Sequence, residues 1–200
     1  MNDIKRKRAL YLSLIRSQFE HCSPVWRPTN CTMMNKMESL QKKCIKWILS
    51  EDFCNYGTYT VYLRKCHQVR LLPLVKRFDY NDLILLYKVL HKLIPIEFPT
   101  YLKFFEGNTR LRRCHLDHLS LISSVKPKSN VITDTNKNCA LYKSFFYRVH
   151  LQWNLLPLEI RSIETLAKFK ADILKYLWKS TLDDIAITDY IEEDLGATFQ

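Results

Sequence analysis

The segment LVKRFDYNDLILLYKVLHKL, residues 74–93, decides the fold class that the sequence predicts. Its large apolar side chains recur near the 3.6-residue period of an α-helix, at Leu74, Phe78, Leu85, Leu86, Val89 and Leu93. Pro95 closes the segment, because proline cannot continue a helix. The segment therefore predicts a long helix with one buried face.

Helical spacing also predicts two helices before this segment. Residues 4–20 form the first, with Ser23-Pro24 as its stop and an apolar stripe of Leu10, Leu14 and Ile15. From about Thr32 to Leu49 a second helix carries a stripe of Met33, Met37, Leu40, Cys44 and Ile48. A shorter segment at about 58–66 is ambiguous between helix and strand.

Two further helices are expected near the C-terminus. The first has one apolar face, ends at Pro157, and carries Tyr142, Phe145, Phe146, Val149 and Trp153. Ser162 can cap the second, whose stripe is Leu166, Phe169, Ile173 and Leu177. Beyond Leu182 the acidic tail is expected to be frayed.

The helical pattern fails between these two groups of helices. Polar residues cluster there, and only Leu119–Ser123 and Val131–Thr133 have strand character. We divide the chain into a helical part over residues 1–105, a connection over 106–138, a helical pair over 139–182 and a disordered acidic tail over 183–200. The expected fold is mainly α, an irregular helical bundle with a long central loop and at most a short β pair.

Charge is the clearest functional signal in the 200 residues. The chain has a net charge of +11, but residues 1–180 carry +17 and residues 181–200 carry −6. With 47% hydrophobic residues the chain has enough apolar surface to fold. A strongly basic globular body favours nucleic acid as the partner.

The composition argues against several other classes of protein. Three glycines leave no glycine-rich loop for a nucleotide phosphate, and no apolar run is long enough to cross a membrane. Seven cysteines, an odd number without a CxxC pair, are interpreted as reduced thiols. We therefore expect an intracellular protein of the nucleus or cytoplasm that is not secreted, takes no small-molecule substrate and needs no cofactor.

Two clusters contain residue types suited to chemistry, but neither has the surroundings that such a site needs. Cys114, His115 and His118 could begin a metal site, but no second ligand pair stands at a matching distance. Asp183-Asp184 resembles the carboxylate pair of a nucleotidyl-transfer site, yet no strand pair flanks it. We predict no catalytic residues and no metal site.

Basic residues interleaved with aromatic ones are the candidate nucleic-acid contacts, because such surfaces follow phosphates and stack on bases. They are Lys5, Lys7, Lys36, Lys42, Lys43, Lys46, Arg110, Arg112 and Arg113. The alternative for each one is a solvated helix face.

Two stretches resemble the reverse transcriptases of non-LTR retrotransposons of the LINE-like, jockey and CR1 types. LYLSLIRSQFEHCSPVW, residues 10–26, followed by MESLQKK, residues 37–43, is similar to the region after the catalytic palm. SFFYRVHLQWNLLP, residues 144–157, with Phe169-Lys170 beyond, is similar to the motif that closes many of these reading frames. The chain departs from the family at Ser17, His21 and Leu155, where Pro, Tyr and Ser are usual.

The resemblance covers roughly residues 5–180 and implies a thumb or post-palm region without the palm and the endonuclease. Its motif residues are expected to be structural: Arg16, Glu20, Ser23, Trp26, Phe145, Arg148, Trp153, Asn154 and Pro157. We expect the aromatic ones to pack in the core and Arg148 to pair with Glu20 or another carboxylate.

Three hypotheses follow. The first is a non-catalytic fragment of an RNA-directed DNA polymerase that binds RNA or an RNA–DNA duplex weakly through its phosphates. The second is a helical protein-interaction module with a basic surface. The third is a pseudogene product without selected function. The sequence leaves the oligomeric state open.

Overall fold

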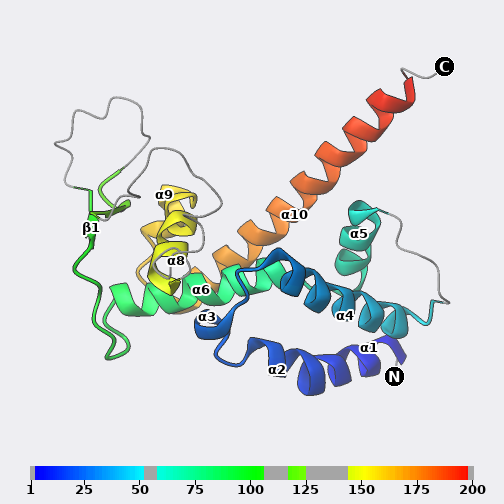
Figure 1. Cartoon of the computed structure of the whole chain (residues 1–200), viewed down its shortest axis with the longest axis horizontal. Coiled ribbons are helices and arrows are strands. Elements are labelled where there is room, and N and C mark those ends of the chain that lie inside the picture. The colour runs from blue at the N-terminus through cyan, green and yellow to red at the C-terminus, as the bar shows by residue number, and fades with distance from the viewer. Residues whose placement is uncertain (1–2, 52–57, 106–116, 125–143, 198–200) are drawn as a thin grey trace. The chain divides into compact units, whose positions relative to one another are not determined.

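The computed structural model describes residues 3–51, 58–105, 117–124 and 144–197 (Figure 1). Among the described residues, helices predominate and one antiparallel pair of short strands accompanies them, which confirms the mainly α fold. The chain divides into two compact units, residues 1–78 with 174–200 and residues 79–173. This division differs from the predicted boundaries, because its borders fall inside two long helices, α6 (Leu74–Leu90) and α10 (Leu166–Ala197).

The first unit begins with a continuous helical run that matches the helix predicted over residues 4–20. It consists of α1 (Asp3–Leu10), the π-helical segment η1 (Tyr11–Arg16) and α2 (Ser17–Glu20). After a left-handed residue at Cys22, the short helix α3 (Ser23–Trp26) follows, with Pro24 in its first turn. Proline fits there because the first N–H groups of a helix have no partner within it.

The predicted apolar stripe of this run is wrong. Leu10, Leu14 and Ile15 are 49%, 65% and 36% exposed, whereas Tyr11 and Arg16 are buried. A π-helix bonds residue i to residue i+5 and has a wider turn than an α-helix. The wider turn in η1 brings Tyr11 and Arg16 to the same side of the run, so the α-helical period points to the wrong residues.

Helices α4 (Cys31–Leu49) and α5 (Tyr59–Val69) complete the helical layer of the first unit with the start of α6. Asn30 caps α4 by accepting a hydrogen bond from the Thr32 N–H. The core of this unit lies between the N-terminal run, α4 and α5. Its buried members are Tyr11, Cys44, Ile45, Ile48, Tyr62, Leu63, Cys66, Val69 and Leu71.

The buried face of α4 is also rotated from the predicted stripe. Cys44 and Ile48 are buried as expected, but Leu40 and Met33 are 42% and 50% exposed. Glu38 and Gln41 occupy the buried face instead, because both side chains find hydrogen-bond partners inside the unit.

The second unit contains the rest of α6, the strands β1 (Leu102–Phe104) and β2 (Leu121–Ser123), α8 (Phe145–Asn154), α9 (Leu158–Arg161) and the start of α10. Its core residues include Tyr87, Val149, Trp153 and Phe169. The rings of Tyr87 and Phe169 stack with centroids 4.2 Å apart. The predicted stripe of α10 is confirmed at Phe169, Ile173 and Leu177, which are all buried.

The β pair uses one predicted strand and one unpredicted strand. β2 lies within Leu119–Ser123 as expected, and it pairs antiparallel with β1 in the register Leu102 to Ser123 and Phe104 to Leu121. The other predicted strand, 131–133, and most of the predicted connection lie outside the described residues.

Helix α10 continues through the segment that was predicted to be a disordered tail. It extends to Ala197, and Lys76 Nζ lies 3.6 Å from the carboxylate of Asp184. Asp183 and Asp184 are therefore helical residues, and residues 183–197 are helical where the sequence predicted disorder. No helix in the described part of the chain is both long and apolar enough to cross a membrane.

Candidate nucleic-acid interface

The exposed face of α4 carries both basic and large apolar side chains. Met33, Lys36, Leu40, Lys43 and Trp47 follow one another at intervals of three and four residues, so they share one face of the helix. All five are exposed. Two lysines that alternate with an aromatic ring and aliphatic side chains offer both phosphate contacts and a stacking surface. We name these five residues the α4 face.

Helix α1 contributes a further basic group beside the end of α4. Lys7 Nζ lies 5.7 Å from the ring centroid of Trp47 and donates a hydrogen bond of 2.7 Å to Ser50 Oγ. It also pairs with Asp3 at 2.8 Å, which neutralises part of its charge. The structure therefore joins two of the predicted basic clusters, the one at the N-terminus and the one on α4.

The remaining predicted basic residues differ in exposure and in their contacts. Lys5 is exposed on α1, and Lys42 and Lys46 are half-buried on the flank of α4. Lys42 Nζ lies 5.0 Å from the ring centroid of Tyr62, so it is engaged with α5. The third predicted cluster, Arg110, Arg112 and Arg113, lies outside the described residues.

A buried polar network holds α4 in place beneath its exposed face. Tyr11 Oη donates to Gln41 Oε1 at 2.7 Å, and Gln41 Nε2 donates to Tyr62 Oη at 2.9 Å and to the Leu72 carbonyl at 3.1 Å. Tyr62 Oη in turn donates to Glu38. Burial raises the pKa of the Glu38 carboxyl, although its hydrogen bonds from Tyr62 and from the backbone oppose the shift.

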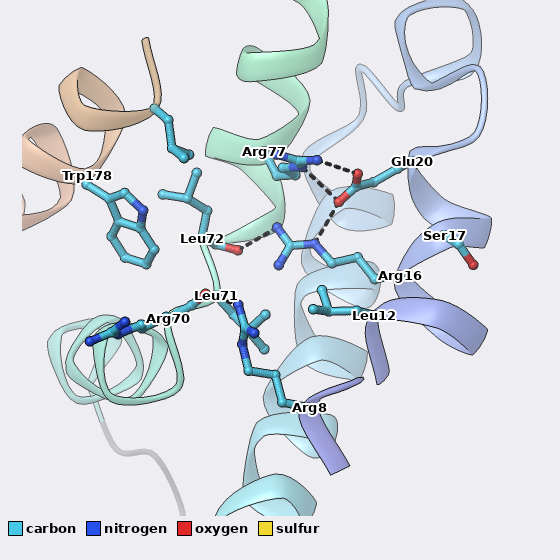
Figure 2. Close-up of a pocket in the computed structure, with 11 residues that line it drawn as sticks. Arg8, Leu12, Arg16, Ser17, Glu20, Arg70, Leu71, Leu72, Arg77 and Trp178 are labelled. Atoms are coloured by element: carbon cyan, nitrogen blue, oxygen red, sulfur yellow. Dashed lines mark hydrogen bonds and ion pairs between the residues drawn. The ribbon is translucent and has the colours of Figure 1, made fainter. Parts of the chain in front are cut away.

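The motif residues Arg16 and Glu20 form a clamp with Arg77 of α6 (Figure 2). Glu20 Oε1 accepts from Arg16 Nε at 2.7 Å and from Arg77 Nε at 2.8 Å, and Glu20 Oε2 accepts from Arg77 Nη2 at 2.8 Å. Arg16 Nη2 also donates to the Leu72 carbonyl at 3.2 Å. Burial alone would raise the pKa of Glu20, but Arg77 and Arg16 outweigh it and lower the pKa.

Ser23 and Trp26 lie just after this clamp, in α3. Ser23 is fully buried, while Trp26 is 40% exposed. The Trp26 ring meets the ring of Phe78 edge to face with centroids 5.8 Å apart, and its Nε1 donates to the His21 carbonyl. Trp26 therefore packs against α6 on one side only, short of the full burial that the sequence predicted.

In the second unit, the residues of the second motif hold α8 against the strand pair. Trp153 is buried, and its Nε1 donates to the Leu119 carbonyl at 2.9 Å. Asn154 bonds both the N–H and the carbonyl of Leu121 at 2.8 Å, as a neighbouring strand would. Pro157 ends α8 and accepts from the N–H groups of the first turn of α9.

The other two residues of this motif also make packing contacts. Arg148 pairs with Asp82 of α6 at 2.9 Å, so its partner is another carboxylate and not Glu20. Asp82 is fully buried, which makes this ion pair part of the interior. Phe145 is half-buried and meets the ring of Phe146 at 5.0 Å.

The residues considered for metal binding give no described cluster. Cys114 and His115 lie outside the described residues, and His118 is exposed. Within the ranges that the structure describes, no three His, Cys, Asp or Glu side chains gather as a metal site. The four described cysteines, Cys22, Cys31, Cys44 and Cys66, are free thiols.

No family model, no curated protein and no solved structure matches this chain. Sequence reasoning missed Trp47 as part of the surface, although its spacing of four from Lys43 on a predicted helix was a usable signal. It also missed Arg70 and Trp178, which line one pocket together with Arg8 and Arg16 (Figure 2), because no local sequence pattern connects these residues.

Proposed function

We propose that this chain binds nucleic-acid duplex, an RNA–DNA hybrid or RNA, through its phosphates, and that the α4 face and Lys7 make the contacts. The observation that carries the proposal is the placement of Lys36, Lys43 and Trp47 on one exposed face of α4, with Lys7 reaching the Trp47 ring from α1. Contacts of this kind position a duplex without reading its sequence. Binding should therefore be weak and insensitive to base sequence.

We further propose that the chain derives from the thumb and post-palm region of a non-LTR retrotransposon reverse transcriptase. The resemblance rests on residues 10–26 and 144–157, and the contacts of Arg16, Glu20, Trp153 and Asn154 are compatible with motif residues kept for packing. In such an enzyme the region would hold the primer–template and leave the chemistry to the palm.

Fluorescence anisotropy with a labelled RNA–DNA hybrid tests duplex binding. We expect affinity to fall steeply between about 50 and 200 mM salt, because bound lysines release counterions from the phosphates. Replacing Lys36 and Lys43 together by Gln should reduce the slope of log affinity against log salt by about 2, roughly 1 for each lost contact.

The matched control replaces Lys168 and Lys170, which are exposed on α10, by Gln. It removes the same charge from another surface and should leave the slope near that of the unaltered protein. Absence of binding at low salt, or equal loss in the two double variants, would refute the α4 face as the contact surface.

A protein-interaction surface is the second candidate for the same face. Met33, Leu40 and Trp47 are between 42% and 50% exposed, and large apolar side chains in one row are typical of a docking surface. A partner held by these three residues would stay bound as salt is raised, whereas a duplex held by the lysines would dissociate.

A further inference from the structure

A pocket of about 340 Å³ lies in the first unit, and none of the residues that line it belongs to α4 (Figure 2). The side chains that matter most in it are Arg8, Arg16, Glu20, Arg70, Arg77 and Trp178. Four guanidinium groups and one carboxylate give this pocket a net charge of +3. Positive charges gathered in this way raise the free energy of the folded chain, and a bound anion lowers it again.

Two of the four arginines are already committed to Glu20, and two are not. Arg16 and Arg77 make the clamp with Glu20. Arg8 Nη2 donates to the backbone carbonyl of Arg70 at 3.1 Å, while Arg8 Nε is buried and has no hydrogen-bond partner among the residues that the structure describes. Neither Arg8 nor Arg70 pairs with a carboxylate in the part of the chain that the structure describes. Among the described residues, the pocket thus holds two guanidinium groups without a carboxylate partner.

The walls beside these guanidinium groups are apolar and aromatic. Leu12, Leu71 and Leu72 line the pocket, and Trp178 stands on the α10 side. The Trp178 ring contacts the His67 ring, with ring centroids 4.5 Å apart and planes tilted by 60°. The volume is at the lower end of the range of small-molecule sites and exceeds what an inorganic phosphate needs.

We propose that this pocket binds the phosphate of a nucleotide, with Arg8 and Arg70 as donors to the phosphate and Trp178 beside the base. The planar guanidinium fork matches two phosphate oxygens, and an indole ring stacks on any base. The inference rests on the geometry of the pocket and does not depend on duplex binding by the α4 face. The nucleotide can be free or can be the 5′-phosphorylated end of a strand.

Calorimetric titration of the full chain with AMP, adenosine and inorganic phosphate tests the proposal. We expect AMP to bind with a Kd below about 1 mM and at least about tenfold more tightly than either of the other two. If adenosine bound as tightly as AMP, the phosphate would contribute nothing to binding, and the proposed phosphate contacts of Arg8 and Arg70 would be refuted. Phosphate that binds as tightly as AMP would overturn the assignment of a nucleotide.

Arg70→Gly is the most informative variant, because Arg70 has a φ of 53° and an exposed side chain. Glycine adopts this backbone conformation readily, so the variant removes the guanidinium without weakening the fold. We expect AMP to bind about tenfold more weakly to Arg70→Gly and to Arg8→Gln, since each loses a charged hydrogen bond. Arg6→Gln, an exposed change on the same helix as Arg8, is the control and should bind AMP normally.

An affinity for AMP that Arg70→Gly and Arg8→Gln leave within about twofold of the unaltered protein would overturn the proposal. A hexathymidylate with a 5′-phosphate and one with a 5′-hydroxyl then distinguish the source of the nucleotide. A preference for the phosphorylated strand over AMP would assign the pocket to strand ends, and a preference for AMP would assign it to free nucleotide. The Lys36 and Lys43 double variant should keep AMP binding, which separates this test from that of the α4 face.

Discussion

The Arg16–Glu20–Arg77 clamp allows a quantitative prediction for Glu20→Gln. The substitution keeps the shape of the side chain but removes a charge that accepts three hydrogen bonds from two guanidinium groups. Arg16 is only 5% exposed and would be left without its counterion, while Glu20 and Arg77 are 22% and 27% exposed.

The size of the effect lies between two limits. Exposed ion pairs are worth up to about 1 kcal/mol, and removing one partner of a buried pair costs about 3–5 kcal/mol. With one member buried and two partly exposed, we expect Glu20→Gln to lose about 2–3 kcal/mol of unfolding free energy near neutral pH.

The pH dependence supplies an independent check on the same clamp. Because Arg77 and Arg16 lower the pKa of Glu20 in the folded chain, the clamp contributes its full stability above the unfolded pKa of about 4.3. That stability is lost as the pH falls through the lowered folded pKa, since the unfolded chain then binds the proton more readily. The difference between the unaltered protein and Glu20→Gln should therefore shrink in acid.

Urea unfolding followed by circular dichroism at about pH 7 and about pH 3 measures both quantities. Glu97→Gln, an exposed glutamate of the second unit, is the control and should behave as the unaltered protein does. A Glu20→Gln loss below about 0.5 kcal/mol at neutral pH would refute the clamp as a stabilising element. A loss that is equal at the two pH values would refute the electrostatic reason for it.

Two further predictions concern packing and the ends of helices. Trp153→Ala should destabilise the protein by about 3–5 kcal/mol, because Trp153 is buried and holds the Leu119 carbonyl. Its thermal midpoint should fall while the folded fraction still binds duplex, and an unchanged midpoint with lost binding would contradict the packing role. Lys92 has a φ of 53°, so Lys92→Gly should stabilise the protein by about 0.5–1 kcal/mol in urea unfolding, whereas Lys92→Ala should not. Equal stability of the Gly and Ala variants would show that this backbone conformation carries no strain.

The positions of the helices could be predicted because their signals are local. α4, α6 and α8 begin and end within a few residues of the predicted limits, since the apolar period and the prolines act on the turn of chain in which they lie. The length of α10 could not be predicted in this way. Its acidic residues resembled a solvated tail, and their continuation as a helix includes the pairing of Asp184 with Lys76, far away in sequence.

The candidate sites show the same difference between local signals and contacts that are distant in sequence. Lys36 and Lys43 could be named from the sequence because exposed basic residues on one helix share a face at fixed spacing. The pocket could not be predicted, because Arg8, Arg70 and Trp178 come from three separate segments and meet only in the folded unit.

The sequence by itself determined that this is a mainly helical, basic chain, because composition and helical period depend only on neighbouring residues. The tertiary structure alone decided which helix faces are buried. Glu38 and Gln41 replace Leu40 in the interior because both find hydrogen-bond partners there, which stabilise buried polar groups. Gln41 bonds Tyr11, Tyr62 and the Leu72 carbonyl, and Glu38 Oε1 accepts from Tyr62 and the Leu74 N–H, although Glu38 Oε2 is buried without a partner among the described residues. The same burial turns Lys36, Leu40, Lys43 and Trp47 outward and thereby forms the α4 face.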